Sequence, residues 1–441
     1  MASEWEAVPL IDLTATPPTY GVVQPGQNSQ DGVPMVRVNN FQGHSLNLAE
    51  VMRIEPEIES KYVRTRIREG DVLITIVGSV GQVAIVPSDL NGWNIARAVA
   101  LVRPKEPELS RWIALVLRSP DAQYQLGVAA NTTVQTTINL KDLRQLRVPF
   151  PEESERCAIA HILGTLDDKI ELNRKQNETL EAMARTLFKA WFVDFEPVRA
   201  KLEGRWRRGQ SLPGLPAHLY DFFPDRLVDS ELGEIPQGWA IGNFSSAVEI
   251  IGGGTPKTSV SEYWGGDIPW FSVVDTPASS DVFVVQTEKS ITRFGLNESS
   301  ARMIAKGTTI ISARGTVGNL AIAGRDMTFN QSCYAFRGKK GSGDYFVFLS
   351  AQCMVEQLKA MAHGSVFSTI TRQTFDAVRC MLPPEQVLKQ FERSAASLFD
   401  AIFGNVNESC SLARLRDTLL PKLISGELRI PEAERILAPA T

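Results

Sequence analysis

The feature that most constrains the fold is a seven-residue periodicity that occurs in two stretches of the chain, 232 positions apart (405 − 173 = 232). In each stretch apolar residues recur at steps of four and three, the spacing that keeps one helix face against a partner helix. Asn173 and Asn405 hold equivalent places, where a buried polar residue favours a register that pairs it. We therefore expect a coiled coil within the chain; the alternative is two amphipathic helices, each buried on its own domain. The expected seam residues are Ile159, Leu163, Leu166, Ile170, Asn173, Leu180, Leu187, Leu398, Ile402, Asn405, Leu412 and Leu419.

The repeat extends into the segments that precede the two helices. The string from Ile67 to Gly81 resembles the string from Ile304 to Gly318, and Thr137-Ile138 matches Thr369-Ile370. Short β-like runs broken by glycine, proline and asparagine surround these strings, which is typical of a mainly β or mixed module. The predicted fold class is α+β with internal duplication: two similar modules, each followed by a long helix. Because the two modules share their landmarks but differ in the residues between them, we expect two related sites with different targets.

Changes in composition divide the chain into successive parts. Proline and glycine are frequent after the first helix, in a stretch too long for a plain turn, which predicts a connector with local structure. Pro421 should kink or end the second helix because proline removes a backbone donor, and Gly426 should release the chain. The expected parts are module one at 1–151, the first helix at 152–196, the connector at 197–235, module two at 236–382, the second helix at 383–426 and a C-terminal tail at 427–441.

Length and composition restrict the class of protein. A chain of 441 residues is too long for one hydrophobic core. The five cysteines are odd in number and scattered, so neither a disulfide framework nor a zinc site is expected. No apolar run approaches the roughly 20 residues that span a bilayer, and Glu4 and Glu6 do not suit a signal peptide. We expect a cytoplasmic protein without membrane contact.

Several polar side chains near glycine turns could contact nucleic acid. The net charge of −4 argues against a protein that coats DNA without sequence preference, but it leaves room for a local basic face. Arginine can contact guanine and asparagine or glutamine can contact adenine; the alternatives are glycines that serve only tight turns and arginines on a solvated surface. Arg64, Arg66 and Arg68 alternate as on one side of a strand. The candidate DNA-contacting residues are Arg64, Arg66, Arg68, Ser79, Asn94, Lys257, Arg314, Thr316, Asn330 and Gln331.

The sequence contains no convincing catalytic constellation. The string from Gly252 to Thr258 resembles a phosphate-binding loop, but Pro256 precedes the lysine where such a loop needs glycine and its N–H. No glycine-rich S-adenosylmethionine loop follows a strand, and none of the four histidines is spaced as a metal ligand. Asp167-Asp168-Lys169 lies inside the first helix, where surface charges are the simpler interpretation. We expect a protein without catalytic or metal-ligand residues of its own.

Three strings of the sequence are distinctive: Leu187 to Val198, Phe223 to Trp239 and Gly252 to Pro256. Through these strings, and over nearly its full length, the chain resembles the specificity subunits of type I restriction-modification systems. Two features depart from the family pattern. The start of module one, Val8 to Asp12, lacks the Gly-Gly-Gly-Thr-Pro string, and the second helix opens with Pro383 to Gln386 instead of a longer acidic segment.

The resemblance implies a role in phage defence. It implies two target-recognition domains held by an antiparallel two-helix coiled coil, which recognise the halves of a bipartite, asymmetric site in double-stranded DNA. Two modification subunits would methylate adenine and motor endonuclease subunits would restrict unmodified DNA. S-adenosylmethionine, ATP and Mg²⁺ would then belong to these partners, and this chain would bind no cofactor. The alternatives are an adaptor whose coiled coil and modules bind proteins without DNA specificity, and an enzyme with an unrecognised site.

Overall fold

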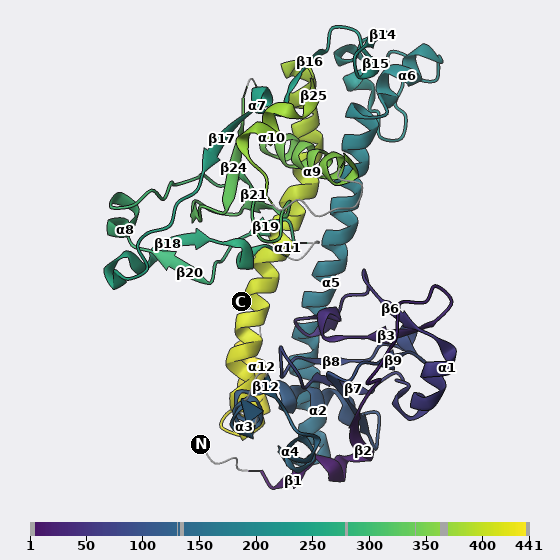
Figure 1. The fold of residues 1–441 in the computed structure, drawn as a ribbon, viewed down its shortest axis with the longest axis vertical. Helices are drawn as coiled ribbons and strands as arrows, with labels where there is room; N and C mark the ends of the chain where they lie inside the picture. The colour runs from purple at the N-terminus through teal and green to yellow at the C-terminus, as the bar shows by residue number, and fades with distance from the viewer. Residues whose placement is uncertain are drawn as a thin grey trace. The chain divides into compact units, whose positions relative to one another are not determined.

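The computed structural model describes residues 5–129, 131–132, 136–277, 281–339, 341–361 and 369–437. The chain forms two compact units, and the two long helices contribute a segment to each. Unit 1 comprises Met1–Glu171 and Cys410–Thr441, and unit 2 comprises Leu172–Ser409. Each unit therefore contains one module together with parts of both helices (Figure 1).

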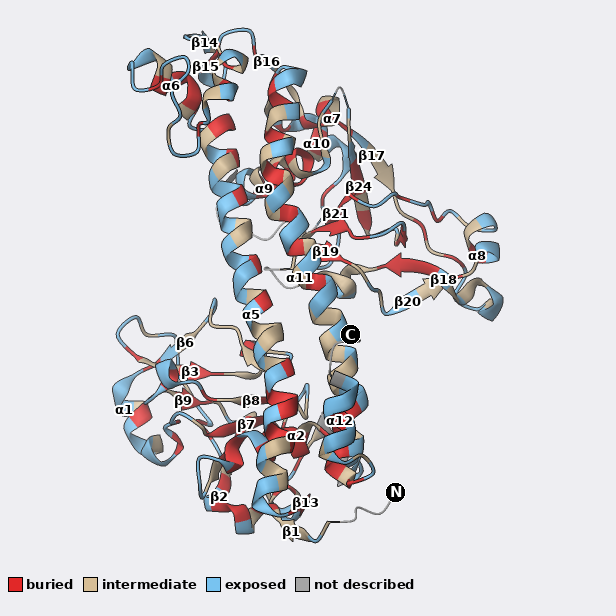
Figure 2. Cartoon of the chain, turned by 180° about the vertical axis from the view of Figure 1, so that it is seen from behind, coloured by how far each residue is buried: buried red, intermediate tan, exposed pale blue. Residues whose placement is uncertain are grey.

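The two helices pair in antiparallel directions within each unit. Helix α5 spans Glu153–Phe192 and helix α11 spans Glu385–Ser425. In unit 1, Arg416 of α11 binds Asp167 of α5 at 2.7 Å. In unit 2, the rings of Phe188 and Phe391 lie 5.8 Å apart. Every predicted seam residue is buried or half-buried, and buried positions recur along one face of each helix (Figure 2). The predicted antiparallel coiled coil is confirmed.

The polar residues of the seam make contacts that are equivalent under the repeat of 232 residues. Asn173 donates to the Ser409 hydroxyl at 3.2 Å, and Asn405 donates to the Asn177 side chain at 2.9 Å. Adding 232 to 173 and 177 gives 405 and 409, so the two contacts are equivalent under the duplication. The Asn173 side chain also donates to the Asn405 carbonyl at 3.4 Å, so the two asparagines contact each other as well. Asn173 is fully buried, and a register that separated these groups would leave it without these bonds.

Pro421, which was expected to kink or end the second helix, does not end it. Pro421 lies inside α11, which continues to Ser425, and Gly426 then adopts a positive φ of 78°. Leu419, Leu420 and Leu423 around the proline are all buried, so tertiary packing offsets the missing backbone hydrogen bond. The segment 427–441, expected to be a tail, contains helix α12 (Ile430–Leu437).

Module one of unit 1 is built on an antiparallel sheet in the order β2-β10-β7-β8. Helices α2 and α3 and the first part of α5 share one hydrophobic core with this sheet, and Leu419 and Ala433 complete that core. A smaller sheet, β6-β3-β9, adjoins it. The bounds are β2 Thr14–Tyr20, β3 Val33–Val36, β6 Met52–Ile54, β7 Val72–Thr75, β8 Val83–Ile85, β9 Asn94–Ile95, β10 Val99–Pro104, α2 Leu109–Arg118 and α3 Pro120–Ala129.

Module two, in unit 2, repeats this plan with an added strand. Its main sheet has the order β17-β24-β21-β22-β19, and its smaller sheet has the order β20-β18-β23. Helix α9 lies on the main sheet next to α11 (Figure 1), and the rings of Tyr345 and Phe399 stack at 4.3 Å between the two helices. The bounds are β17 Val248–Gly252, β18 Trp264–Phe271, β19 Phe283–Val284, β20 Lys289–Ile291, β21 Thr309–Ser312, β22 Leu320–Ala323, β23 Thr328–Phe329, β24 Cys333–Gly338 and α9 Asp344–Met361.

Short strand pairs close the two modules in the same way. In module one, β1 (Ala7–Pro9) pairs with β13 (Arg147–Pro149) just before α5. In module two, β16 (Ala240–Asn243) pairs with β25 (Arg379–Leu382) just before α11. Equivalent sheets, closing strands and helices confirm the predicted α+β fold with internal duplication.

The connector between the modules is folded rather than extended. It contains α6 (Glu196–Leu202), the 3₁₀ helix η5 (Ala217–Phe222) and the hairpin of β14 (Leu227–Ser230) with β15 (Gly233–Pro236). The Lys201 ammonium group donates to the carbonyls of Tyr220 and Phe223 and lies 3.9 Å from the Tyr220 ring centroid. These contacts hold η5 against α6. In the part of the chain that the structure describes, no helix is long and apolar enough to cross a membrane.

Candidate nucleic-acid interface

Strand register places three loops of module two at one end of its main sheet. β17 and β21 both run antiparallel to the central strand β24, so their carboxyl ends lie beside the amino end of β24. The register pairs Gly252 with Tyr334 and Ser312 with Cys333. We call the loops that meet here the second sheet end; they comprise residues 253–255, 313–318 and 330–332.

The second sheet end brings together four of the predicted residues. Arg314 and Thr316 are exposed on the loop after β21, and Asn330 and Gln331 precede β24. The Thr255 hydroxyl donates to the side-chain oxygen of Gln331, which orients the glutamine amide. Asn330 is half-buried and its side-chain oxygen accepts from the Ser332 backbone at 3.1 Å. An arginine and an oriented glutamine on one exposed edge suit contacts to base edges.

Lys257 lies apart from these four residues. It is exposed, and its carbonyl accepts a hydrogen bond from the Trp264 indole at 3.2 Å. Trp264 begins β18, whereas Phe271 at the other end of that strand accepts from the Asn330 backbone. Lys257 is therefore placed beside the end of β18 that faces away from Asn330.

A hydroxyl group holds the glycine turn in each module. Ser312 donates to the Thr316 carbonyl and accepts from the Asn319 backbone at 2.9 Å. In module one, Thr75 donates to the Ser79 carbonyl at 2.6 Å and accepts from Gln82 at 2.9 Å. The turn glycines Gly78, Gly81, Gly315 and Gly318 all have positive φ, so the turn geometry itself requires them. The side chains of Ser79 and Thr316 are exposed.

Module one has an equivalent sheet end. Tyr20 pairs with Ala100 and Thr75 pairs with Val99, so the loops after β2 and β7 meet the loop before β10. We call residues 21–23, 76–81 and 96–98 the first sheet end.

Equivalent backbone hydrogen bonds beside two glycines show how the two sheet ends correspond. The Val22 N–H, after Gly21, donates to the Ile95 carbonyl at 2.7 Å, and the Gly254 N–H, after Gly253, donates to the Phe329 carbonyl at 2.9 Å. The position that corresponds to the glycine string is therefore at Gly21 in module one, downstream of the segment from Val8 to Asp12 that lacks the string. The sequence indicates this match only weakly, because module one retains a single glycine, Gly21, of the Gly-Gly-Gly-Thr-Pro string.

The structure corrects the prediction for Arg64, Arg66 and Arg68. Arg64 lies in the 3₁₀ helix η3 (Ser60–Thr65), and the other two lie in the loop that follows, so the three do not alternate on a strand. This loop enters the amino end of β7, which is the end opposite to Ser79. Arg66 binds Glu59 at 2.6 Å, and its hydrogen bonds hold the pKa of that carboxyl below the ordinary value. Arg66 thus has a structural partner.

Asn94 is a structural residue rather than a base reader. Its side chain is fully buried and donates to Glu59 and to the Tyr62 carbonyl, both at 3.1 Å. Its oxygen accepts from the Thr65 hydroxyl at 2.7 Å. With donors and acceptor used inside the module, Asn94 has nothing left to offer a base. Sequence chemistry alone does not reveal this because burial depends on the fold.

Sequence reasoning missed Arg97, which the fold places at the first sheet end. Arg97 stands two residues before β10, as Gln331 stands two residues before β24. Its side chain is exposed and makes no hydrogen bond or ion pair with any residue that the structure describes. Matching the strand starts Val99 and Cys333 would have found it.

The acidic pair inside the first helix has structural partners. Asp168 accepts from Arg111 at 2.9 Å, and the equivalent Asp400 accepts from the Tyr345 hydroxyl at 3.2 Å. Each aspartate therefore anchors a helix of its own module. Within the described ranges, no group of three or more His, Cys, Asp or Glu side chains is placed to hold a metal ion.

A half-buried ion network fixes module one on the coiled coil of unit 1. Asp167 accepts from Arg118 of α2 at 2.9 Å and from Arg416 of α11 at 2.7 Å. Burial lowers the pKa of Arg118 to about 10, which still leaves it charged at neutral pH. Burial and these two arginines lower the pKa of His44 to about 4.

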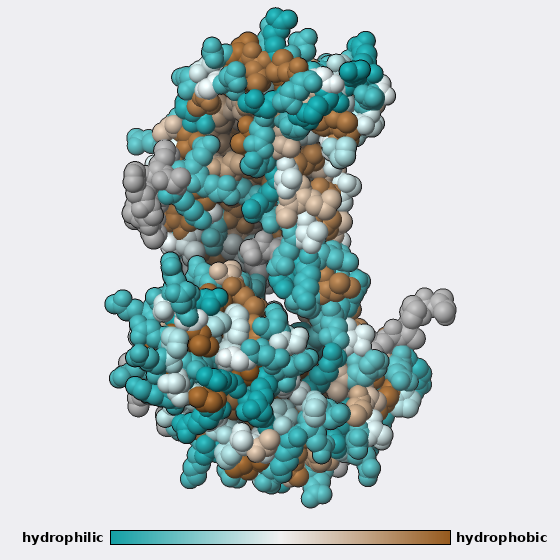
Figure 3. All heavy atoms as spheres, turned by 90° about the vertical axis from the view of Figure 1, so that its right-hand side faces the viewer, coloured by the Kyte–Doolittle hydropathy of each residue, from teal (hydrophilic) through white to brown (hydrophobic). Residues whose placement is uncertain are grey.

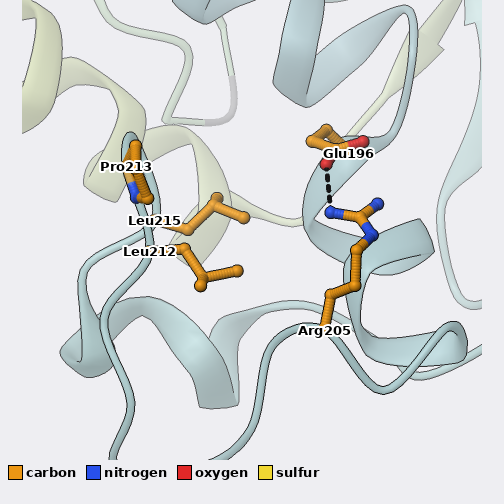
Figure 4. Close-up of a pocket in the computed structure, with 5 residues that line it drawn as sticks. All are labelled: Glu196, Arg205, Leu212, Pro213 and Leu215. Atoms are coloured by element: carbon orange, nitrogen blue, oxygen red, sulfur yellow. Dashed lines mark hydrogen bonds and ion pairs between the residues drawn. The ribbon is translucent and has the colours of Figure 1, made fainter.

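A cavity in the connector offers no reactive chemistry. Its volume is about 420 Å³, and Glu196, Arg205, Leu212, Pro213 and Leu215 line it (Figure 4). Glu196 and Arg205 pair with each other at 2.8 Å and are thereby neutralised. The molecular face in Figure 3 is largely hydrophilic, with hydrophobic residues gathered in separate patches.

Comparisons with known proteins agree on one family. A model described as the type I restriction modification DNA specificity domain matches residues 3–182 and 236–393. The HindI specificity subunit of a type I restriction enzyme from Haemophilus influenzae is 28% identical over 82% of this chain and 87% of its own. The EcoBI specificity subunit from Escherichia coli is 33% identical over 44% of this chain and 40% of its own. The crystal structure of a type I restriction-modification S subunit from M. genitalium has the same fold, with a TM-score of 0.52, 14% identity and 96% coverage of each chain.

Proposed function

This chain belongs to the type I restriction-modification DNA specificity family, and from that premise we propose that each module recognises one half of a bipartite, asymmetric DNA site through its sheet end. As a specificity subunit the chain supplies DNA sequence recognition to the complex and is not itself an enzyme. The recognised DNA is double-stranded, and the sheet ends are where side chains would meet base edges.

This proposal rests on one observation: the two sheet ends have the same backbone arrangement but carry different side chains. Val77 bridges Thr137 where Arg314 bridges Thr369, so a half-buried apolar residue in module one replaces an exposed arginine in module two. Arg97 likewise stands where module two has Gln331. DNA sequence is recognised by side-chain contacts to base edges. Two sheet ends with the same backbone arrangement and different side chains are therefore suited to two different half-sites.

The proposal includes the partners and the location. Two modification subunits would methylate adenine with S-adenosylmethionine, and motor endonuclease subunits would use ATP and Mg²⁺. Those cofactors would be bound by the partners, and the assembly would work in the cytoplasm. The paired helices support a spacer role, because two long helices can hold two modules at a set interval. The free cysteines are consistent with a reducing compartment.

The decisive experiment is a genome-wide map of N6-methyladenine in cells that carry the cognate modification subunit, with and without this chain. We expect a bipartite, asymmetric motif to be methylated only when the chain is present. Methylation that is the same in both strains, with an expressed and active modification subunit, would favour the protein-binding adaptor instead.

A further inference from the structure

The two sheet ends share one position that is filled by different side chains, Arg97 in module one and Gln331 in module two. Ile95 pairs with Val36 in a parallel bridge, and Phe329 pairs with Phe271 in the same way. Arg97 follows Ile95 by two residues, and Gln331 follows Phe329 by two residues. The register of the small sheets thus gives the same match as the starts of β10 and β24.

The backbone of Arg97 is hydrogen-bonded within module one, whereas its side chain has no hydrogen-bond or ion-pair partner among the described residues. Its N–H donates to the Val22 carbonyl at 2.8 Å, which fixes the loop on the residue after Gly21. Other arginines of module one are neutralised: Arg66 by Glu59, and Arg103 by Asp71 at 2.7 Å. The exposed Arg97 guanidinium has no such partner within the described part of the chain.

The surroundings of Arg97 differ from those of Gln331, whose side chain is oriented by the Thr255 hydroxyl. Val23 takes the place of Thr255 when Gly21 is aligned with Gly253, so no hydroxyl is available there. Val23 and Tyr20 are 39% and 40% exposed, which leaves apolar surface at or beside the first sheet end. A planar guanidinium beside apolar groups can contact the guanine O6 and N7 atoms together, and the apolar groups can contact a thymine methyl.

We propose that position 97 and position 331 are the same specificity-determining position of the two modules, and that Arg97 contacts a guanine in the half-site of module one. Gln331, oriented by Thr255, fills the equivalent role in module two with amide chemistry that suits adenine. This inference rests on the proposed function, because it assigns a residue within the DNA contact made by the sheet ends.

The test compares Arg97→Gln and Arg97→Lys with Arg64→Gln in the complex with the modification subunits. Arg64 is an exposed arginine of the same module that lies outside the sheet end. The wild-type methylation map first gives both half-sites. Binding is then measured on the native duplex and on duplexes in which each guanine of the first half-site is replaced in turn.

We expect both Arg97 variants to bind the native duplex roughly 5- to 150-fold more weakly, the range of one bidentate base contact. One guanine should lose its effect on binding in these variants, and the second half-site should be unchanged. Arg64→Gln should retain the full dependence on that guanine.

A phosphate contact would give a different result. Arg97→Lys would then bind nearly as the wild type, and Arg97→Gln would weaken binding to all duplexes alike, which would overturn the inference. Absence of any motif in the wild-type map would instead contradict the proposed function, so the two failures are distinguishable.

Discussion

At the scale of single residues, the same side chain serves opposite purposes in different surroundings. Asn94 is fully buried with its polar atoms bonded inside module one, whereas Asn330 is half-buried at the second sheet end. Arg66 neutralises Glu59, whereas Arg314 is exposed on a turn. Residue type therefore defines what a group can bind, and burial decides whether it is available.

Replacing Asn94 by alanine should destabilise the protein rather than alter DNA specificity. The change removes hydrogen bonds to Glu59 and Thr65 and leaves buried polar groups unpaired, for which we expect a loss of about 2–4 kcal/mol. Urea unfolding would measure it, with Ser88→Ala, an exposed site on the same module, as the control. An unchanged unfolding free energy with an altered methylation motif would restore Asn94 as a base contact.

His44 should make the stability of unit 1 fall on mild acidification. Its pKa in the folded protein is about 4, lowered by burial and by Arg118 and Arg416, against an ordinary value of 6.5. Above pH 6.5 both states are neutral; as the pH falls towards 4 only the unfolded chain gains the proton, so stability decreases by up to about 3 kcal/mol. His44→Gln should lack this contribution. Equal pH profiles of unfolding for the two proteins between pH 7 and 4 would refute it.

At the scale of elements, the two helices derive their pairing from a repeated seam, and polar groups fix its register. Phe188, Trp191 and Phe391 close the seam in unit 2, where the ring centroids of Trp191 and Phe391 lie 5.7 Å apart. In unit 1 the Asp167 network adds charge pairing to apolar packing. The seam residues also belong to the module cores, which explains how α11 tolerates Pro421.

A seam residue and an exposed residue of the same helix should differ sharply in their contribution to stability. Leu163 is fully buried in the core of unit 1, so Leu163→Ala should cost about 2–5 kcal/mol. Leu172 of the same helix is 50% exposed, and Leu172→Ala should cost well under 1 kcal/mol. Thermal unfolding of both variants tests the assignment, and similar melting temperatures would show that Leu163 is not a core residue.

At the scale of the whole molecule, unit 1 is built from two segments that are far apart in sequence, whereas unit 2 is one continuous segment. Unit 1 needs the segment after Cys410, because Leu423 and Ala433 complete the core of module one. Module two, like module one, is closed by its own terminal strands, β16 and β25, and none of the residues between them belongs to the core of unit 1. Residues between these strands can therefore change without removing any part of the core of unit 1.

Exchange of residues 240–380 for the corresponding module of another family member should change only one half of the methylated motif. The reason is that module one and both long helices keep their own residues. Methylation mapping of the hybrid provides the measurement, and the wild-type chain provides the reference. Changes in both halves would show that the modules do not recognise DNA independently.

The sequence by itself determined the duplication, the heptad seam, the α+β class and the family, because these depend on patterns that local periodicity and repeated strings record. Only the tertiary structure decided which polar groups are available. Ser79 and Arg68 are close in sequence yet lie at opposite ends of β7. The register of β10 with β7 places Arg97 at the same end of the sheet as Ser79. Strand pairing links residues far apart in the chain, and burial depends on all of its neighbours at once. Neither quantity can be obtained from the spacing of residues along one strand.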